Sequence, residues 1–265
     1  MRRRLSGQAR TGIAVLAVLA LAAAAMIGYL VVRDRDMAAA SANSGFTPAP
    51  LPTPTRPAAT PATPPAPALQ VKRPLSGPLR VLFAGDSLTG SYFASTEAKG
   101  FRPLLVDAMA RAGEVDPVGV GVPHGRLSEV EAGTVIPTGA QLAVVEVGTN
   151  DFGKTQIPDF RAQYDALLAS IDKASPGVAF LCTGIWRGGS EVNSGIRGED
   201  YDAAIKASCE ARKGRYVPLY PIYDAAGSRG PEGVTTWIGK SDTFHPNDAG
   251  HAAIAHAIAA AINVS

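Results

Sequence analysis

RVLFAGDSLTG, residues 80–90, joins a short apolar run to a turn that carries a serine. An unbroken apolar run of this length is typical of a strand buried on both faces of a parallel sheet. A serine on the following turn would present its hydroxyl at the carboxyl edge of the sheet, where neighbouring backbone N–H groups can bind an anion. Gly85 allows the backbone to make so tight a turn. The stretch therefore predicts an α/β sheet with Ser87 as a candidate nucleophile.

The rest of the chain alternates apolar runs with longer segments of helical periodicity. Further strands are predicted at residues 118–122, 142–147, 178–182 and 215–220. Helices are predicted at residues 101–112, 157–174, 201–212 and 248–262. Strands separated by helices predict a parallel sheet with helices on both faces, and the loops at the carboxyl ends of its strands form the ligand crevice.

A second candidate group, DTFH at residues 242–245, lies near the C-terminal end of the sequence. Asp242 stands three residues before His245, so its carboxylate can fold back and accept a hydrogen bond from the imidazole Nδ1–H. That bond would leave Nε2 free to take a proton from a serine. The simpler alternative is a helix-capping aspartate beside an incidental histidine.

Two loops at the predicted carboxyl edge hold possible donors for an oxyanion. Asn150 lies in GTND, residues 148–151, after the third strand, and Gly125 lies in PHGR, residues 123–126, after the second. An oxyanion hole needs such donors about 3 Å from the developing charge. Asparagine and glycine are also common turn residues, so each has a purely structural alternative.

Together these motifs resemble the SGNH hydrolases, the GDSL esterase and lipase family, over residues 79–263. The serine, glycine, asparagine and histidine of that family match Ser87, Gly125, Asn150 and His245, and Asp242 matches its triad acid. The resemblance implies a flavodoxin-like three-layer α/β/α sandwich with a five-stranded parallel sheet of order 2-1-3-4-5. It also implies an acyl-enzyme mechanism without a cofactor. No spacing in the sequence indicates a metal site.

Three functions are compatible with this pattern. The first is an extracytoplasmic serine esterase that hydrolyses O-acyl esters of a glycan or lipid through Ser87, His245 and Asp242. The second is an acyltransferase that uses the same triad to modify a cell-envelope glycan. The third is a non-catalytic binding module, which an intact triad disfavours.

The N-terminal region differs in composition from the remainder. Residues 11–32 contain no charged side chain, and a helix needs about 20 apolar residues to cross a bilayer. The segment therefore predicts a single-pass signal-anchor, and the arginines before it predict that residues 1–10 stay in the cytoplasm. Residues 33–76 are rich in Ala, Pro and Thr and predict a disordered linker. The hydrolase domain at 77–265 would then lie outside the cytoplasm. The alternative is secretion after cleavage near Ala38–Ala40.

The charge distribution argues against nucleic acid as a partner. Residues 1–76 carry nine basic and two acidic side chains, which leaves 16 basic and 21 acidic in residues 77–265. A nucleic-acid-binding domain needs a basic surface of its own. Four basic residues nevertheless lie on or beside the loops of the predicted crevice: Arg126, Lys154, Arg187 and Lys240. If at least one of them is partly buried, we expect the enzyme to prefer anionic esters.

The two cysteines, Cys182 and Cys209, both fall in the part of the chain predicted to be exported. An oxidising compartment permits a disulfide between them. Two buried free thiols are the alternative, because cysteine is often fully buried.

Overall fold

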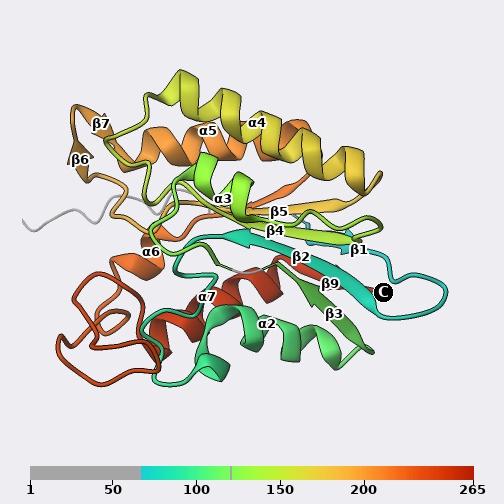
Figure 1. The fold of residues 1–265 in the computed structure, drawn as a ribbon, viewed down its shortest axis with the longest axis horizontal. Coiled ribbons are helices and arrows are strands. Elements are labelled where there is room, and N and C mark those ends of the chain that lie inside the picture. The colour runs from blue at the N-terminus through green and yellow to red at the C-terminus, as the bar shows by residue number, and fades with distance from the viewer. Residues whose placement is uncertain (1–66, 120) are drawn as a thin grey trace, which may run out of the picture. The chain divides into compact units, whose positions relative to one another are not determined.

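The computed structural model describes residues 67–119 and 121–265 (Figure 1). The predicted signal-anchor at 11–32 and most of the predicted linker at 33–76 lie outside these residues. Within the described part of the chain, no helix is both long enough and apolar enough to cross a membrane.

A five-stranded sheet, parallel throughout, forms the centre of the described fold. Its strands are β2 (Leu79–Gly85), β3 (Val115–Val118), β4 (Leu142–Glu146), β5 (Ala179–Thr183) and β8 (Arg215–Val217). They are ordered β3-β2-β4-β5-β8, which is 2-1-3-4-5 when these five strands alone are numbered. The predicted five-stranded parallel sheet and its order are therefore confirmed.

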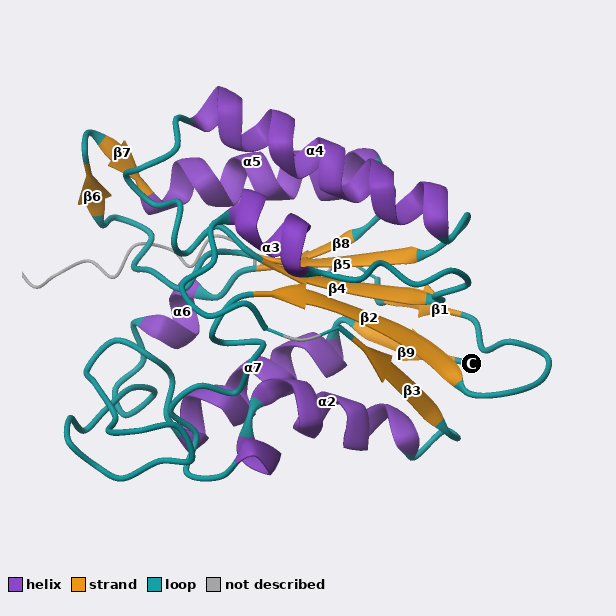
Figure 2. Cartoon of the chain, viewed as in Figure 1, coloured by secondary structure: helices purple, strands orange, loops and turns teal. Residues whose placement is uncertain are grey.

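Helices cover both faces of the sheet (Figure 2). The helices α2 (Phe101–Ala110) and α7 (Asp248–Ala260) lie on one face. The other face packs against α3 (Leu127–Gly133), α4 (Ile157–Ala174) and α5 (Gly198–Ala211). Successive side chains of β2 point to opposite faces of the sheet. Leu82 packs in the core on the α4 side, and Phe83 packs in the core on the α7 side.

Two predicted strands have different bounds in the structure. The strand predicted at 118–122 lies earlier in the structure, at Val115–Val118, and the predicted segment keeps only an isolated parallel bridge from Gly121 to Gly85. Gly119 follows with a φ of 88°, and a Cβ there would lie 2.1 Å from the Phe83 carbonyl oxygen, so the regular ladder ends at this glycine. The strand predicted at 215–220 stops at Val217, because Pro218 has no N–H to donate, and the short helix α6 (Tyr220–Tyr223) follows.

Several short elements were not predicted. β1 (Leu69–Val71) pairs in parallel with β9 (Ile262–Val264) in a separate two-stranded sheet, and β6 (Val192–Asn193) pairs with β7 (Ile196–Arg197). A single 3₁₀ turn, η1 (Glu97–Lys99), precedes α2. Because β1 falls within the segment assigned to the linker, ordered structure begins before residue 77.

A disulfide joins Cys182 on β5 to Cys209 on α5, with a Cα–Cα distance of 6.2 Å. Both residues are fully buried between the sheet and the helix. The pairing that the sequence left open is therefore present, and it ties the interior strand β5 to the helix that covers it.

Candidate active site

The turn after β2 brings Ser87 to the carboxyl edge of the sheet. Its side chain is nearly buried, at 4% exposure, and its Oγ lies 3.1 Å from the Nε2 of His245. A Cβ on Gly85 would lie 1.9 Å from the Thr89 Oγ1, so the packing of the turn requires glycine there. Gly121 has a similar constraint, because its Cβ would lie 2.2 Å from the Asp86 carbonyl oxygen.

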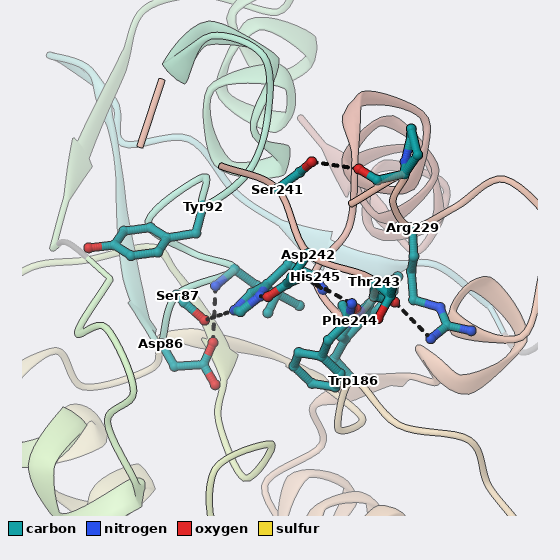
Figure 3. A network of polar contacts seen from close by, with 12 residues as sticks. Asp86, Ser87, Tyr92, Trp186, Arg229, Ser241, Asp242, Thr243, Phe244 and His245 are labelled. Carbon is teal, nitrogen blue, oxygen red and sulfur yellow. Dashed lines mark hydrogen bonds and ion pairs between the residues drawn. The ribbon is translucent and has the colours of Figure 1, made fainter. Parts of the chain in front are cut away.

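The loop before α7 supplies the other two predicted triad residues (Figure 3). The Nδ1 of His245 lies 2.7 Å from the Asp242 Oδ2. The other oxygen, Oδ1, accepts backbone N–H bonds from Phe244 at 2.9 Å and from His245 at 2.7 Å. These three contacts hold the carboxylate and the imidazole in one orientation, so Ser87, His245 and Asp242 form one continuous chain of polar contacts.

The pKa values of this pair suit a neutral imidazole beside an ionised carboxylate. Burial lowers the pKa of His245 below its ordinary value, although the hydrogen bond and charge of Asp242 oppose the shift. Burial would raise the pKa of Asp242, but hydrogen bonds from the N–H and ring of His245 outweigh it and leave that pKa lowered. A neutral His245 is the form that can accept the Ser87 proton.

Trp186 holds this loop from the sheet side. Its indole N–H donates to the Phe244 carbonyl oxygen at 2.7 Å, and its backbone N–H donates to the Thr149 Oγ1 at 2.9 Å. The side chain is fully buried, so it packs beneath the site. Trp237 is 40% exposed, and its indole N–H donates to the Ser91 carbonyl oxygen.

The three candidate oxyanion donors differ in availability. Asn150 Nδ2 donates to the Asp86 Oδ2 at 3.0 Å and to the Gly125 carbonyl oxygen at 3.1 Å, so both of its hydrogens are engaged. The Gly125 N–H donates to the Val122 carbonyl oxygen at 3.0 Å, and the expectation that it is a free donor is therefore not met in this structure. Among the described residues, none accepts a hydrogen bond from the Ser87 N–H.

Buried carboxyl groups beneath the turn were not predicted as part of the site. The Oδ1 of Asp86 accepts the Leu88 N–H at 3.0 Å, and burial raises the pKa of Asp86 to about 7. Glu146, at the end of β4, is fully buried close by. A charged residue type inside a strand that is otherwise apolar was the sequence signal that could have identified Glu146.

Two other histidines have distinct surroundings. His251 on α7 is fully buried, where its Nδ1 accepts the Phe101 N–H at 3.2 Å and its Nε2 donates to the Tyr92 carbonyl oxygen at 3.0 Å. Burial lowers the pKa of His251 to about 4, so it is neutral and joins α7 to the segment after the Ser87 turn. His124 is exposed.

Arg187 is the cation most closely associated with the site. Its guanidinium lies 4.3 Å from the centre of the Phe244 ring and 5.4 Å from that of Phe152, and it pairs with Glu191 at 3.2 Å. Its side chain is 29% exposed, and its charge contributes to the lowered pKa of His245. The other three cations named from the sequence are exposed: Arg126, Lys154 and Lys240.

No group of three or more His, Cys, Asp or Glu side chains in the described residues is placed to hold a metal ion. Ser87, His245 and Asp242 place a hydroxyl, an imidazole and a carboxylate in contact, and these are the groups that nucleophilic and acid–base chemistry uses.

Comparison with known proteins extends this description. Residues 83–253 match the model of the GDSL-like lipase/acylhydrolase family. No curated protein matches the chain.

Solved structures share the fold at low sequence identity. A catalytic mutant of Axe2, an acetylxylan esterase from Geobacillus stearothermophilus, is 17% identical with a TM-score of 0.55, covering 70% of this chain and 94% of its own. A carbohydrate esterase family 2 enzyme from Corynascus thermopiles is 17% identical with a TM-score of 0.54, covering 71% and 67%. The psychrotrophic esterase EstA from Pseudoalteromonas sp. is 14% identical with a TM-score of 0.53, covering 69% and 96%.

Proposed function

Since the chain belongs to the GDSL-like lipase/acylhydrolase family and is a hydrolase, we propose that it cleaves carboxylic esters with Ser87 as nucleophile, His245 as base and Asp242 as the residue that orients the base. The observation that carries the proposal is the contact chain from the Ser87 Oγ through His245 to Asp242, with separations of 3.1 Å and 2.7 Å. Each separation lies within the range of a hydrogen bond, which proton transfer between positioned groups requires.

In the proposed reaction, His245 Nε2 takes the hydroxyl proton as the Ser87 Oγ attacks the ester carbonyl carbon. The resulting tetrahedral adduct collapses when His245 returns the proton to the leaving alcohol, and the acyl group stays on Ser87. Water then attacks the acyl-enzyme with His245 again as base, which releases the carboxylic acid. Asp242 stays ionised and stabilises the protonated imidazole.

The oxyanion would be held first by the Ser87 N–H, which lacks a partner among the described residues. Asn150 would join it by exchanging one of its present acceptors, the Asp86 carboxylate or the Gly125 carbonyl, for the substrate oxygen.

A short acyl group on a glycan is the proposed substrate. Support comes from the fold neighbours, which include acetylxylan esterases and a carbohydrate esterase. Transfer of the acyl group to a sugar instead of water would use the same acyl-enzyme and is measured by the same assay.

The proposed location is outside the cytoplasm, with the chain held at the membrane by residues 11–32. The disulfide between Cys182 and Cys209 supports export, because disulfides persist in oxidising compartments and are rare in the cytosol. Membrane fractionation and a C-terminal reporter active only in the cytoplasm test this. Reporter activity would overturn the orientation, and release of a shortened protein would favour cleavage.

The proposed activity is tested with purified wild-type, Ser87→Ala and His245→Ala proteins on a short-chain aryl ester and on an acetylated polysaccharide, each with and without a sugar acceptor. Both variants should remain folded and lose turnover. A Ser87→Ala protein that kept a tenth of wild-type kcat would overturn the assignment of the nucleophile.

A further inference from the structure

A buried carboxyl group beneath the Ser87 turn has no part in the ester-cleaving steps above. Glu146 is the last residue of β4, and its partner across the sheet is Gly85, the last residue of β2. The other four residues of β4 are apolar, and all five are buried. Placing an acid in such a strand costs free energy unless hydrogen bonds compensate, so its partners indicate what it contributes.

One oxygen of Glu146 accepts three hydrogen bonds from the turn. Oε2 accepts the Asp86 N–H at 3.3 Å, the Thr89 N–H at 3.3 Å and the Thr89 hydroxyl at 2.9 Å. These donors lie on both sides of Ser87 along the chain. A single acceptor atom therefore fixes the entry and the exit of the turn that carries the nucleophile.

The surroundings favour the neutral acid form of Glu146. Burial raises its pKa well above the ordinary value, and the negative charge of Asp86 raises it further. Two neighbouring buried carboxyl groups do not readily carry two charges. The carbonyl oxygen of a protonated acid still accepts hydrogen bonds, so the three contacts do not require a charge on Glu146.

We propose that Glu146 is a positioning residue whose Oε2 holds the main chain on both sides of Ser87, so that the serine hydroxyl faces His245. This inference rests on the proposed function, in which Ser87 is the nucleophile. The same turn is linked through the Asp86 carboxylate to Asn150, so a displaced turn would disturb the nucleophile and a candidate oxyanion donor together. Misplacement of reacting groups by about 1 Å can cost about 10²-fold in rate.

The test compares Glu146→Gln with Glu146→Leu, and uses Glu210→Leu on the exposed surface of α5 as the matched control. The Gln variant keeps a neutral side chain with one carbonyl oxygen, so it should retain most of the wild-type kcat and an unchanged pH profile of kcat/KM. The Leu variant leaves the three donors without their acceptor, so kcat should fall about 10²-fold with little change in KM. The control should match the wild type.

Thermal unfolding accompanies each measurement, since a residue that only supports the scaffold would change the Tm and leave the kcat of the folded protein intact. A folded Glu146→Leu protein with wild-type kcat overturns the positioning role, as does a Gln variant as impaired as the Leu variant. If Glu146→Leu does not fold, Thr89→Val decides, because it removes the 2.9 Å contact and leaves Glu146 in place. Lower kcat at unchanged KM supports the proposal, and unchanged kcat overturns it.

Ser87→Ala is measured alongside, so that failure of the proposed function can be distinguished from failure of the positioning role of Glu146. An active Ser87→Ala protein would overturn the proposed function and the positioning role together. An inactive Ser87→Ala protein beside a fully active Glu146→Leu protein would overturn the positioning role alone.

Discussion

Asp242→Asn should abolish most of the ester hydrolysis while leaving the fold in place. The substituted amide keeps a carbonyl oxygen that can accept the Phe244 and His245 backbone N–H groups, now at 2.9 Å and 2.7 Å from Oδ1. Only the 2.7 Å contact between Oδ2 and the His245 Nδ1 must change, because an NH₂ group would then face the ring N–H. The imidazole would favour the tautomer with its proton on Nε2, which cannot accept the Ser87 proton.

The loss in kcat should be about 10⁴-fold, or about 5.4 kcal/mol of activation free energy. The loss in folding stability should stay within about 1 kcal/mol, because the Asp242 side chain is 40% exposed and the amide keeps both backbone hydrogen bonds. Asp242 also raises the pKa of His245 against the effect of burial. Its replacement should therefore move the acid limb of any residual activity to lower pH.

The assay is initial-rate hydrolysis of a neutral short-chain ester from pH 4 to pH 9 (roughly the range that spans an imidazole titration), with urea unfolding on the same samples. Asp248→Asn is the matched control, since Asp248 binds Ser95 and Lys99 at the start of α7. It should keep wild-type kcat. Less than a tenfold loss of kcat for Asp242→Asn, or an acid limb that moves to higher pH, would contradict the proposed role of Asp242.

Asn150→Ala should lower kcat about 10²–10³-fold through loss of an oxyanion donor; an unchanged kcat in steady-state assays would remove it from the site. Replacing Cys182 and Cys209 together by Ala should lower the free energy of unfolding by about 3.5 kcal/mol, from the entropy of a loop with a sequence separation of 27. Urea unfolding measures this, and a loss below about 1 kcal/mol contradicts the loop-entropy account. Arg187→Gln should reduce kcat/KM for an anionic ester more than for a neutral ester of equal length, and added salt should shrink the difference. Equal effects on both esters, or the same effect from exposed Arg126→Gln, would contradict a role for the Arg187 charge.

The parts of the fold that could be predicted are those whose pattern is local. β2 and β4 are apolar apart from Arg80 and Glu146, because both faces of each strand are buried. The bounds predicted for α4 agree with the structure, because its apolar positions recur at helical spacing and all point to one core. The strand corresponding to β3 was predicted too late in the chain, because the valines that alternate with glycines at residues 118–122 look like a strand. The positive φ of Gly119, which ends β3, cannot be recognised from the sequence.

The missing pieces depend on partners that are distant along the chain. The three residues of β1 follow a proline-rich segment, so nothing local indicates a strand. Their partners are at the other end of the described chain, where Leu69 pairs with Ile262. The candidate triad was accessible because each group lies in a short motif of its own. Trp186 and His251 were not assigned contacts from the sequence, because their partners Phe244 and Tyr92 come close only in the folded protein.

The assignment of Ser87 as nucleophile is tested by identifying the residue that becomes covalently modified. The wild-type protein is incubated with a phosphonate ester that reacts with activated serines, and the adduct is located by peptide mass spectrometry. We expect one adduct per chain, on Ser87, with none on the Ser87→Ala protein and much slower labelling of the His245→Ala protein. An adduct on another residue, or equal labelling of the Ser87→Ala protein, would contradict it.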